Sequence, residues 1–172
     1  QRLTGLDYQT LLKQILENAD LYPGMQVLEV AAGTGMIARH LVGLVGSEGK
    51  IIGVDSTNEL IEQARLDAQS AKVSTRIDWR VASIRHLPFR AGQLDLVTCG
   101  VFNQFEPQEF FQEIHRVLRM EGVLLTAAEL TPPAAIADWT QKLRRQYNRL
   151  FKGESEEAKA YYHSAHELTE ML

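Results

Sequence analysis

Short apolar segments alternate with helix-periodic segments through the central part of the chain. Five of the apolar segments have the composition of buried strands, at residues 27–31, 51–54, 75–81, 94–98 and 123–127. Between them, apolar residues recur at the spacing of an amphipathic helix. This alternation predicts βαβ units and an α/β fold of the Rossmann-like type, a doubly wound parallel sheet with helices on both faces. Segment 75–81 is the least apolar, so we expect it near a sheet edge.

The 172 residues are expected to form a single domain, because this length and an apolar fraction of 45% fit one globular core. We expect an N-terminal amphipathic helix within residues 1–24 and a core of βα units over 25–130. Two further helices, 134–151 and 154–172, are expected within the C-terminal part, 131–172. Ligands of such sheets bind at the carboxyl ends of the strands, which directs attention to the turn after the first strand.

Composition narrows the environment and the partners. The net charge of −4 disfavours a role dominated by nucleic-acid phosphates. The single cysteine, Cys99, excludes an internal disulfide and fits a reducing compartment. No apolar stretch approaches the ~20 residues that a membrane-spanning helix needs. We therefore expect a cytoplasmic protein without a transmembrane segment and without a nucleic-acid partner.

A glycine-rich turn follows the first strand, in the run from Glu29 to Gly35. Small residues there let the backbone approach a ligand, and the next helix offers unpaired N–H groups. Gly33-Thr34-Gly35 alone would favour a tight turn without a ligand. Glu29 changes this balance, because a carboxylate in an apolar strand is costly to bury without partners. We expect Glu29 to fix the turn and to meet a cationic amine.

Asp55 ends the second strand, about 20 residues beyond the glycine turn, where acidic residues bind ribose hydroxyls. A turn or capping aspartate is the alternative, although Ser56 and Thr57 are rival caps. The two features together favour a ribose-containing ligand. Residues 33–38 also satisfy the dinucleotide fingerprint, so an NAD-binding oxidoreductase domain is an alternative. Glu29 within the strand and the lack of a separate substrate domain weigh against it.

Several motifs together resemble class I S-adenosylmethionine-dependent methyltransferases, in particular the small-molecule subgroup that includes ubiquinone/menaquinone methyltransferases. The run 29–35 resembles their motif I, with Ala31 in place of the first glycine. Leu87-Pro88-Phe89 and the following 94–97 resemble their Leu-Pro-Phe…Phe-Asp-x-Val segment. Residues 113–122 resemble their E-x-x-R-V-L-x-P-G-G segment, with Met120-Glu121 in place of Pro-Gly. The resemblance covers residues 11–129 and is specific for the cofactor, not for the methyl acceptor.

The resemblance implies S-adenosylmethionine as cofactor and methyl transfer to a small molecule. It implies these cofactor-binding residues: Glu29, Ala31, Gly33, Gly35, Asp55, Ser56, Ser83, Ile84, Cys99 and Gly100. Ser83 stands where the family often has an aspartate that binds the adenine amino group, so we expect adenine recognition to survive in weaker form. Ile84 would offer a backbone N–H and an apolar face, and Cys99 and Gly100 would approach the methionine part. No metal site is implied.

The acceptor and the catalytic residues stay open. Phe102, Asn103 and Phe105 follow the fourth strand and either face the acceptor or pack against the next helix. The candidates for a general base are His86, His115, His163 and His166, with none preferred. We expect the C-terminal helices to cover the acceptor site. A cofactor-binding partner subunit without catalysis is a further alternative.

The family's sheet usually continues into two more strands, whereas the pattern of this sequence is still helical at its end. We therefore expect a sheet that lacks the last two strands and leaves the apolar fifth strand at an edge. Such an edge invites pairing. We expect a longer parent protein, an edge covered by the terminal helices, or self-association through that edge.

Overall fold

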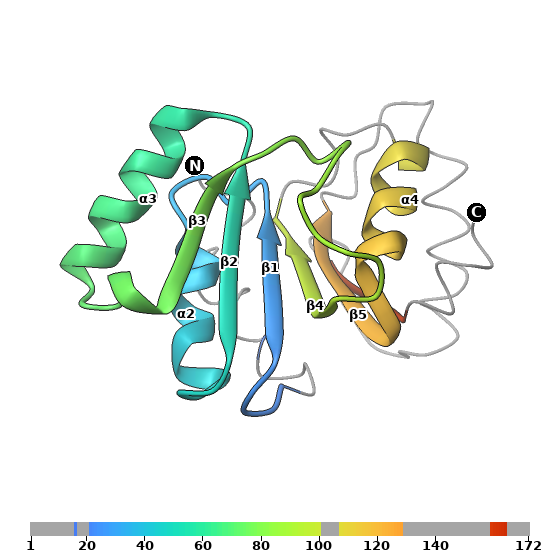
Figure 1. Ribbon diagram of the computed structural model, residues 1–172, viewed down its shortest axis with the longest axis horizontal. Helices are drawn as coiled ribbons and strands as arrows, with labels where there is room; N and C mark the ends of the chain where they lie inside the picture. Colours follow the sequence, from blue (N-terminus) through green and yellow to red (C-terminus); the bar gives the residue numbers. More distant parts are fainter. Residues whose placement is uncertain (1–15, 17–20, 101–106, 129–158, 165–172) are drawn as a thin grey trace.

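A six-stranded sheet organises the residues that the structure, a computed structural model, describes, namely 16, 21–100, 107–128 and 159–164 (Figure 1). The strands are β1 (Gln26–Val30), β2 (Lys50–Asp55), β3 (Ile77–Val81), β4 (Leu94–Cys99), β5 (Leu118–Ala128) and β6 (Lys159–Ser164). Their order is β3-β2-β1-β4-β5-β6. Strands β1 to β5 are parallel, and β6 is antiparallel to β5. The predicted parallel α/β sheet is confirmed, and β3 lies at an edge as expected.

The helices divide between the two faces of the sheet. Helices α2 (Met36–Leu44) and α3 (Asn58–Ser70) cover one face, and α4 (Pro107–Val117) covers the other; the short 3-10 helix η1 (Ser74–Arg76) precedes β3 (Figure 1). Successive residues of a strand point to opposite faces. In β1, Val27 therefore joins the core beneath α2 and α3, while Leu28 joins the core beneath α4.

The order of the strands places a topological switch beside β1. The chain runs from β1 outward through β2 to β3, and β4 then returns to the other side of β1. Crevices at such a switch, beyond the carboxyl ends of the strands, are where open α/β sheets bind ligands. The glycine turn follows β1 and therefore lies at this position.

Asp95 ties together the opposite, amino ends of the central strands. One of its carboxylate oxygens accepts a 2.7 Å hydrogen bond from Gln26 N at the start of β1. The other accepts a 2.9 Å bond from the hydroxyl of Tyr22 and lies 2.6 Å from Nε of Arg119 in β5. The aspartate of the Leu-Asp-Leu-Val segment thus has a structural role, far from the glycine turn.

The C-terminal part departs from the prediction. Residues 154–172 were expected to be helical, but 159–164 form β6, which pairs with β5 from Val123 to Ala128. Among the described residues after β5, one further strand is therefore present, and it pairs with the edge of β5 that was expected to be bare. Self-association of the protein stays a prediction. The remainder of 129–172 lies outside the described residues, as does the helix predicted at 134–151.

Two smaller differences concern the ends of elements. β5 was expected to begin at Val123 after a turn at Gly122, but it begins at Leu118, directly after α4. A shift in register between the Leu94–Leu118 and Leu96–Val123 pairs accommodates the intervening residues. Of the predicted N-terminal helix, only Leu16 is described, as a buried residue. Within the described ranges, no helix has the length and apolar character needed to cross a membrane.

Candidate cofactor site at the carboxyl ends of the strands

A cavity of about 490 Å³ lies at the carboxyl ends of β1, β2 and β3. Its walls come from the glycine turn, the start of α3, the turn after β3 and the first described residues of α4. Six of the predicted cofactor residues line it: Ala31, Gly33, Asp55, Ser56, Ser83 and Ile84. Leu60 and Phe110, which the sequence analysis did not assign to the site, add apolar surface. Residues far apart in the sequence thus meet in one place, as the resemblance implied.

Asp55 connects the glycine turn to the start of α3. Its Oδ2 accepts a 2.9 Å hydrogen bond from Gly33 N, and its Oδ1 accepts a 2.9 Å bond from Thr57 N. The side chain is only 8% exposed, yet it belongs to the wall of the cavity. A carboxylate offers about four acceptor positions, so capacity remains beyond these two bonds. The structural role considered for Asp55 is present, and the ribose-binding role stays a prediction.

Glu29 is buried in β1 and supports the first turn of α2. The N-cap residue Gly35 has no side chain, and Glu29 Oε2 accepts a 2.8 Å hydrogen bond from Ala38 N. The first N–H groups of a helix have no partner within the helix, so this bond satisfies one of them. Burial raises the pKa of Glu29 to about 8, against the opposing effect of hydrogen bonds from Ala38 and Ile37 and of the charge of Arg39. Glu29 therefore fixes the turn, while its contact with a cationic amine stays a prediction.

The backbone of the glycine turn has left-handed conformations at three positions. Ala31 has φ 50°, at the position where the family has glycine, so its side chain is strained. Gly33 has φ +55° and lines the cavity, and a Cβ there would meet nothing within 4 Å. Gly35 has φ +73°, and a Cβ there would lie 2.0 Å from Cη2 of Trp79. The two glycines therefore serve different purposes, open space for Gly33 and packing for Gly35.

Trp79 explains Gly35 and is a residue that the sequence analysis did not single out. It pairs in register with Gly53 of β2, where a Cβ would lie 2.2 Å from Cζ3 of the indole. The ring thus fills a notch between Gly35 and Gly53 and is 6% exposed. A glycine in one strand and a tryptophan in a predicted neighbouring strand were the available signal.

The turn at residues 83–86, after β3, forms another part of the cavity wall. Ala82 N donates a 2.9 Å hydrogen bond to Asp55 O, which holds the ends of β2 and β3 together. His86 N donates to Ser83 O at 3.1 Å and closes the turn. The Ser83 hydroxyl accepts a 3.3 Å bond from Arg85 N. The turn thus presents an exposed hydroxyl and the half-buried Ile84 to the cavity.

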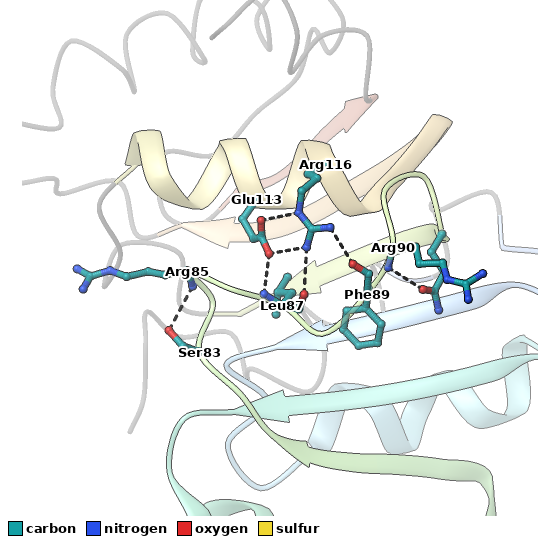
Figure 2. A network of polar contacts seen from close by, with 8 residues as sticks. Ser83, Arg85, Leu87, Phe89, Arg90, Glu113 and Arg116 are labelled. Carbon is teal, nitrogen blue, oxygen red and sulfur yellow. Dashed lines mark hydrogen bonds and ion pairs between the residues drawn. The ribbon is translucent and has the colours of Figure 1, made fainter.

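A buried peptide segment and an ion pair of α4 form a network beside this turn (Figure 2). The guanidinium of Arg116 bonds both carboxylate oxygens of Glu113, at 2.6 and 2.8 Å. It also donates to Leu87 O at 3.0 Å and to Phe89 O at 2.7 Å. Glu113 Oε1 accepts a 2.6 Å bond from Leu87 N. The hydrogen bond with Arg116 is the main reason that the pKa of Glu113 lies below its usual value.

The remaining predicted residues are not brought to the cavity wall. Glu29 is buried within β1, Gly35 ends the glycine turn against Trp79, and Cys99 is buried at the end of β4, next to Gly100. His163 lies in β6 opposite Leu124, not in a helix as expected, while Phe102, Asn103, Phe105 and His166 lie outside the described residues. His86 is exposed and His115 lies in α4. Among the described residues, no group of three or more acidic, histidine or cysteine side chains is placed to hold a metal ion.

The comparisons with known proteins agree with this geometry. The 2-phytyl-1,4-naphtoquinone methyltransferase of Nostoc sp. is 37% identical over 99 residues, 56% of this chain and 43% of that protein. The ubiquinone/menaquinone biosynthesis C-methyltransferase UbiE of Citrifermentans bemidjiense is 32% identical over 109 residues, 62% of this chain and 46% of that protein. The chain spans less than half the length of these two curated relatives.

A solved structure adds support for the fold. A SAM dependent methyltransferase from Aquifex aeolicus superposes with a TM-score of 0.73 at 20% identity, over 92% of this chain and 94% of that one. The family described as methyltransferase domain matches residues 27–122, more than half of the chain. That range contains the glycine turn, Asp55 and the Glu113–Arg116 pair, and it decides between the two cofactor classes that the glycine motif left open. This chain belongs to the methyltransferase domain family.

Proposed function

We propose that the protein is an S-adenosylmethionine-dependent methyltransferase and that its cofactor occupies the cavity at the ends of β1, β2 and β3. The observation that carries this proposal is the convergence of Asp55 and the turn 83–86 on one cavity, beside a glycine turn whose open side faces it. In this assignment Asp55 accepts hydrogen bonds from the ribose hydroxyls, with Ser56 next to it. Ser83 and Ile84 contact adenine.

The residues present fit such a group. The cavity combines a buried carboxylate with apolar surface from Leu60, Ile84 and Phe110, as a ribose attached to a flat base requires. A side chain at Gly33 would project into open space, which a ligand fills in this assignment. Cys99 ends β4 and Gly100 follows it, next to β1 in the sheet, and their backbone is assigned to the methionine part.

In this proposal, catalysis rests mainly on aligning the acceptor's nucleophilic atom with the methyl group of the cofactor. The sulfonium of S-adenosylmethionine supplies an activated methyl group when the cofactor is bound, so holding the nucleophile in line supplies much of the rate. The chain's own contribution is a turn fixed from below by Glu29 and from the side by Asp55, through Ala38 N and Gly33 N. No residue is assigned here as a general base.

We further propose a quinone-type small molecule as acceptor. The support is the names of the two curated relatives, which act on a naphthoquinone or in ubiquinone and menaquinone synthesis. The acceptor site and its expected cover by residues 131–172 stay predictions, because 101–106 and most of 131–172 lie outside the described residues and 159–164 form β6. Truncation after Thr131 is not a clean test of this cover, because it also removes β6 from the edge of β5.

The test is a calorimetric titration with S-adenosylmethionine, S-adenosylhomocysteine and NAD, followed by a transfer assay with labelled S-adenosylmethionine and a reduced naphthoquinone. We expect both adenosyl compounds to bind and NAD not to compete with them. Preferential binding of NAD would refute the proposal. Cofactor binding without transfer to any quinol would instead support the alternative of a non-catalytic partner subunit.

A further inference from the structure

We propose that Glu113 and Arg116 of α4 are positioning residues for adenine recognition, because they set the place of the turn 83–86 through the segment Leu87-Pro88-Phe89. The inference rests on the proposed function, which assigns adenine to Ser83 and Ile84. It gives a joint role to two motifs that are far apart in the sequence, because the hydrogen bond between Leu87 and Glu113 joins residues 26 positions apart.

The segment 87–89 makes one internal hydrogen bond, from Phe89 N to Leu87 O at 2.8 Å, and takes its other partners from outside. Pro88 has no N–H, so the segment cannot continue the ladder of a central strand. The side chains of Leu87 and Phe89 are 2% and 8% exposed, which draws their peptide groups toward the protein interior. A buried peptide group without a partner costs free energy comparable to a lost hydrogen bond. Leu87 N, Leu87 O and Phe89 O are all partnered by Glu113 and Arg116.

The Glu113–Arg116 pair can hold the segment in one position because the two side chains fix each other's orientation. Two parallel bonds join the guanidinium to the carboxylate, and charge-assisted bidentate pairs are the more directional kind. The Glu113 side chain is 11% exposed and that of Arg116 37% exposed, so the carboxylate is largely screened from water. The remaining donors of Arg116 then point at fixed places, where they hold the two carbonyl groups (Figure 2).

The segment 87–89 directly follows the turn 83–86, which lines the cavity, so a shift of the segment also moves the turn. Leu87 and Phe89 belong to the core cluster beneath α4, and Ile84 packs against the same cluster. The turn 83–86 is held at its other end by the Ala82 N to Asp55 O bond. With both ends fixed, the direction of the Ser83 hydroxyl and of the Ile84 backbone depends on where Leu87 is held.

A purely structural ion pair would look similar in sequence, and the chain offers one for comparison. Glu62 and Arg65 have the same i,i+3 spacing on α3, with side chains 57% and 48% exposed. Exposed pairs of this kind contribute little to stability. Glu62 does not line the cavity, so Glu62→Gln is a matched control for Glu113→Gln.

The experiment measures base selectivity by calorimetry, with S-adenosylhomocysteine and S-inosylhomocysteine, whose bases carry an amino group and an oxo group at position 6. We expect the wild-type protein to bind the adenosyl compound at least ~10-fold more tightly, the scale of one hydrogen bond. Glu113→Gln and Arg116→Lys should reduce this ratio to less than about a third of the wild-type value, and Glu62→Gln should leave it unchanged. Arg116→Lys keeps the charge and a donor, so it tests the inference even where Glu113→Gln does not fold.

The ratio separates positioning from general stability, because a loss of folded protein weakens both ligands equally. Selectivity that survives in both α4 variants would overturn the inference and leave the proposed function standing. Equal binding of both compounds by the wild-type protein would overturn the assignment of adenine to the turn, and this inference with it. No binding of either compound by the wild-type protein would instead refute the proposed function.

Discussion

The two ends of the central strands are built in opposite ways. At the amino ends, Asp95 is surrounded by donors from Tyr22, Gln26 and Arg119. At the carboxyl ends, the backbone adopts left-handed conformations, one of them at a strained alanine, around a cavity of about 490 Å³. Both ends carry residues of the family's motifs. A residue of a family motif can therefore stabilise the fold or line a ligand site, depending on whether it lies at the amino or the carboxyl end of a strand.

The comparison predicts separate consequences for the two ends. Changes at the carboxyl ends should reduce ligand binding more than stability, and changes at the amino ends should do the reverse. Residues that lie between, such as Glu29, should affect both.

The largest effect on ligand binding is expected at Gly33. Gly33→Val should weaken S-adenosylhomocysteine binding by ~100-fold or more, about 2.7 kcal/mol, because its side chain enters the space assigned to the ligand. The fold should survive, since an added Cβ meets no protein atom within 4 Å, although the positive φ costs ~1–2 kcal/mol. Calorimetry and a thermal melt measure the two quantities. Gly35→Val is the control that should unfold, because of Trp79. Normal binding by folded Gly33→Val would show that the cavity is not the ligand site.

The next effect concerns pH and Glu29. Its pKa of about 8 in the folded protein lies above its value in the unfolded chain, so the folded state favours the neutral acid. The stability that this group contributes is fully present below about pH 4.5 and is lost as pH rises to about 8. Glu29→Gln, which cannot ionise, should remove this part of the pH dependence, which amounts to several kcal/mol. Urea denaturation of both proteins at pH 5, 6.5 and 8 checks it, and parallel pH profiles would contradict it.

Substitutions of Asp55 and Asp95 compare the two ends of the strands most directly, and their expected effects are smaller. Asp55→Asn should weaken S-adenosylmethionine binding by ~1.5–3 kcal/mol, the range for hydrogen bonds to a charged group. Asp95→Asn should lower the free energy of unfolding by ~1–3 kcal/mol and leave binding by the folded protein unchanged. Asparagine keeps one carbonyl acceptor, so neither variant leaves all the backbone donors unpaired. A loss of binding in Asp95→Asn without a loss of stability would break the comparison.

The smallest effect is expected at Ala31, which lies at the ligand end. Ala31→Gly should raise the free energy of unfolding by up to ~1 kcal/mol, because relief of the left-handed strain outweighs the added freedom of the unfolded chain. Thermal and urea unfolding measure the change. A lower stability would mean that the methyl group of Ala31 contributes more through packing than its φ angle costs.

Local patterns in the sequence were enough to predict the central strands, the glycine turn and the edge position of β3. The strands β1, β2 and β4 are apolar and short, and the glycine turn follows β1 where the spacing placed it. The edge position of β3 followed from its mixed composition, in which only Ile77 and Trp79 are buried. Six of the predicted site residues could be placed at the cavity because parallel strands bring their carboxyl ends to one edge.

The parts that were missed depend on contacts between distant segments. β6 contains Tyr161 and Tyr162, which favour strands, but its partner β5 ends about 30 residues earlier, and the surrounding pattern is helical. The hydrogen bonds from Gly33 and Thr57 to Asp55 are likewise not visible in the motif itself. The Glu113–Arg116 pair was identified only as part of a motif, because its partners lie in another one.

The notch between Gly35 and Gly53 also makes the protein a natural optical sensor. The sequence contains two tryptophans, and replacing Trp139 by phenylalanine leaves Trp79 as the single emitter. Its indole lies against Gly35 of the glycine turn, and its N–H has no partner among the described residues, so its fluorescence should respond to a change in that contact. Any movement of the turn during ligand capture then becomes a change in emission that stopped-flow mixing can time. An emission spectrum that is identical with and without saturating ligand would mean that the turn is already in its final shape.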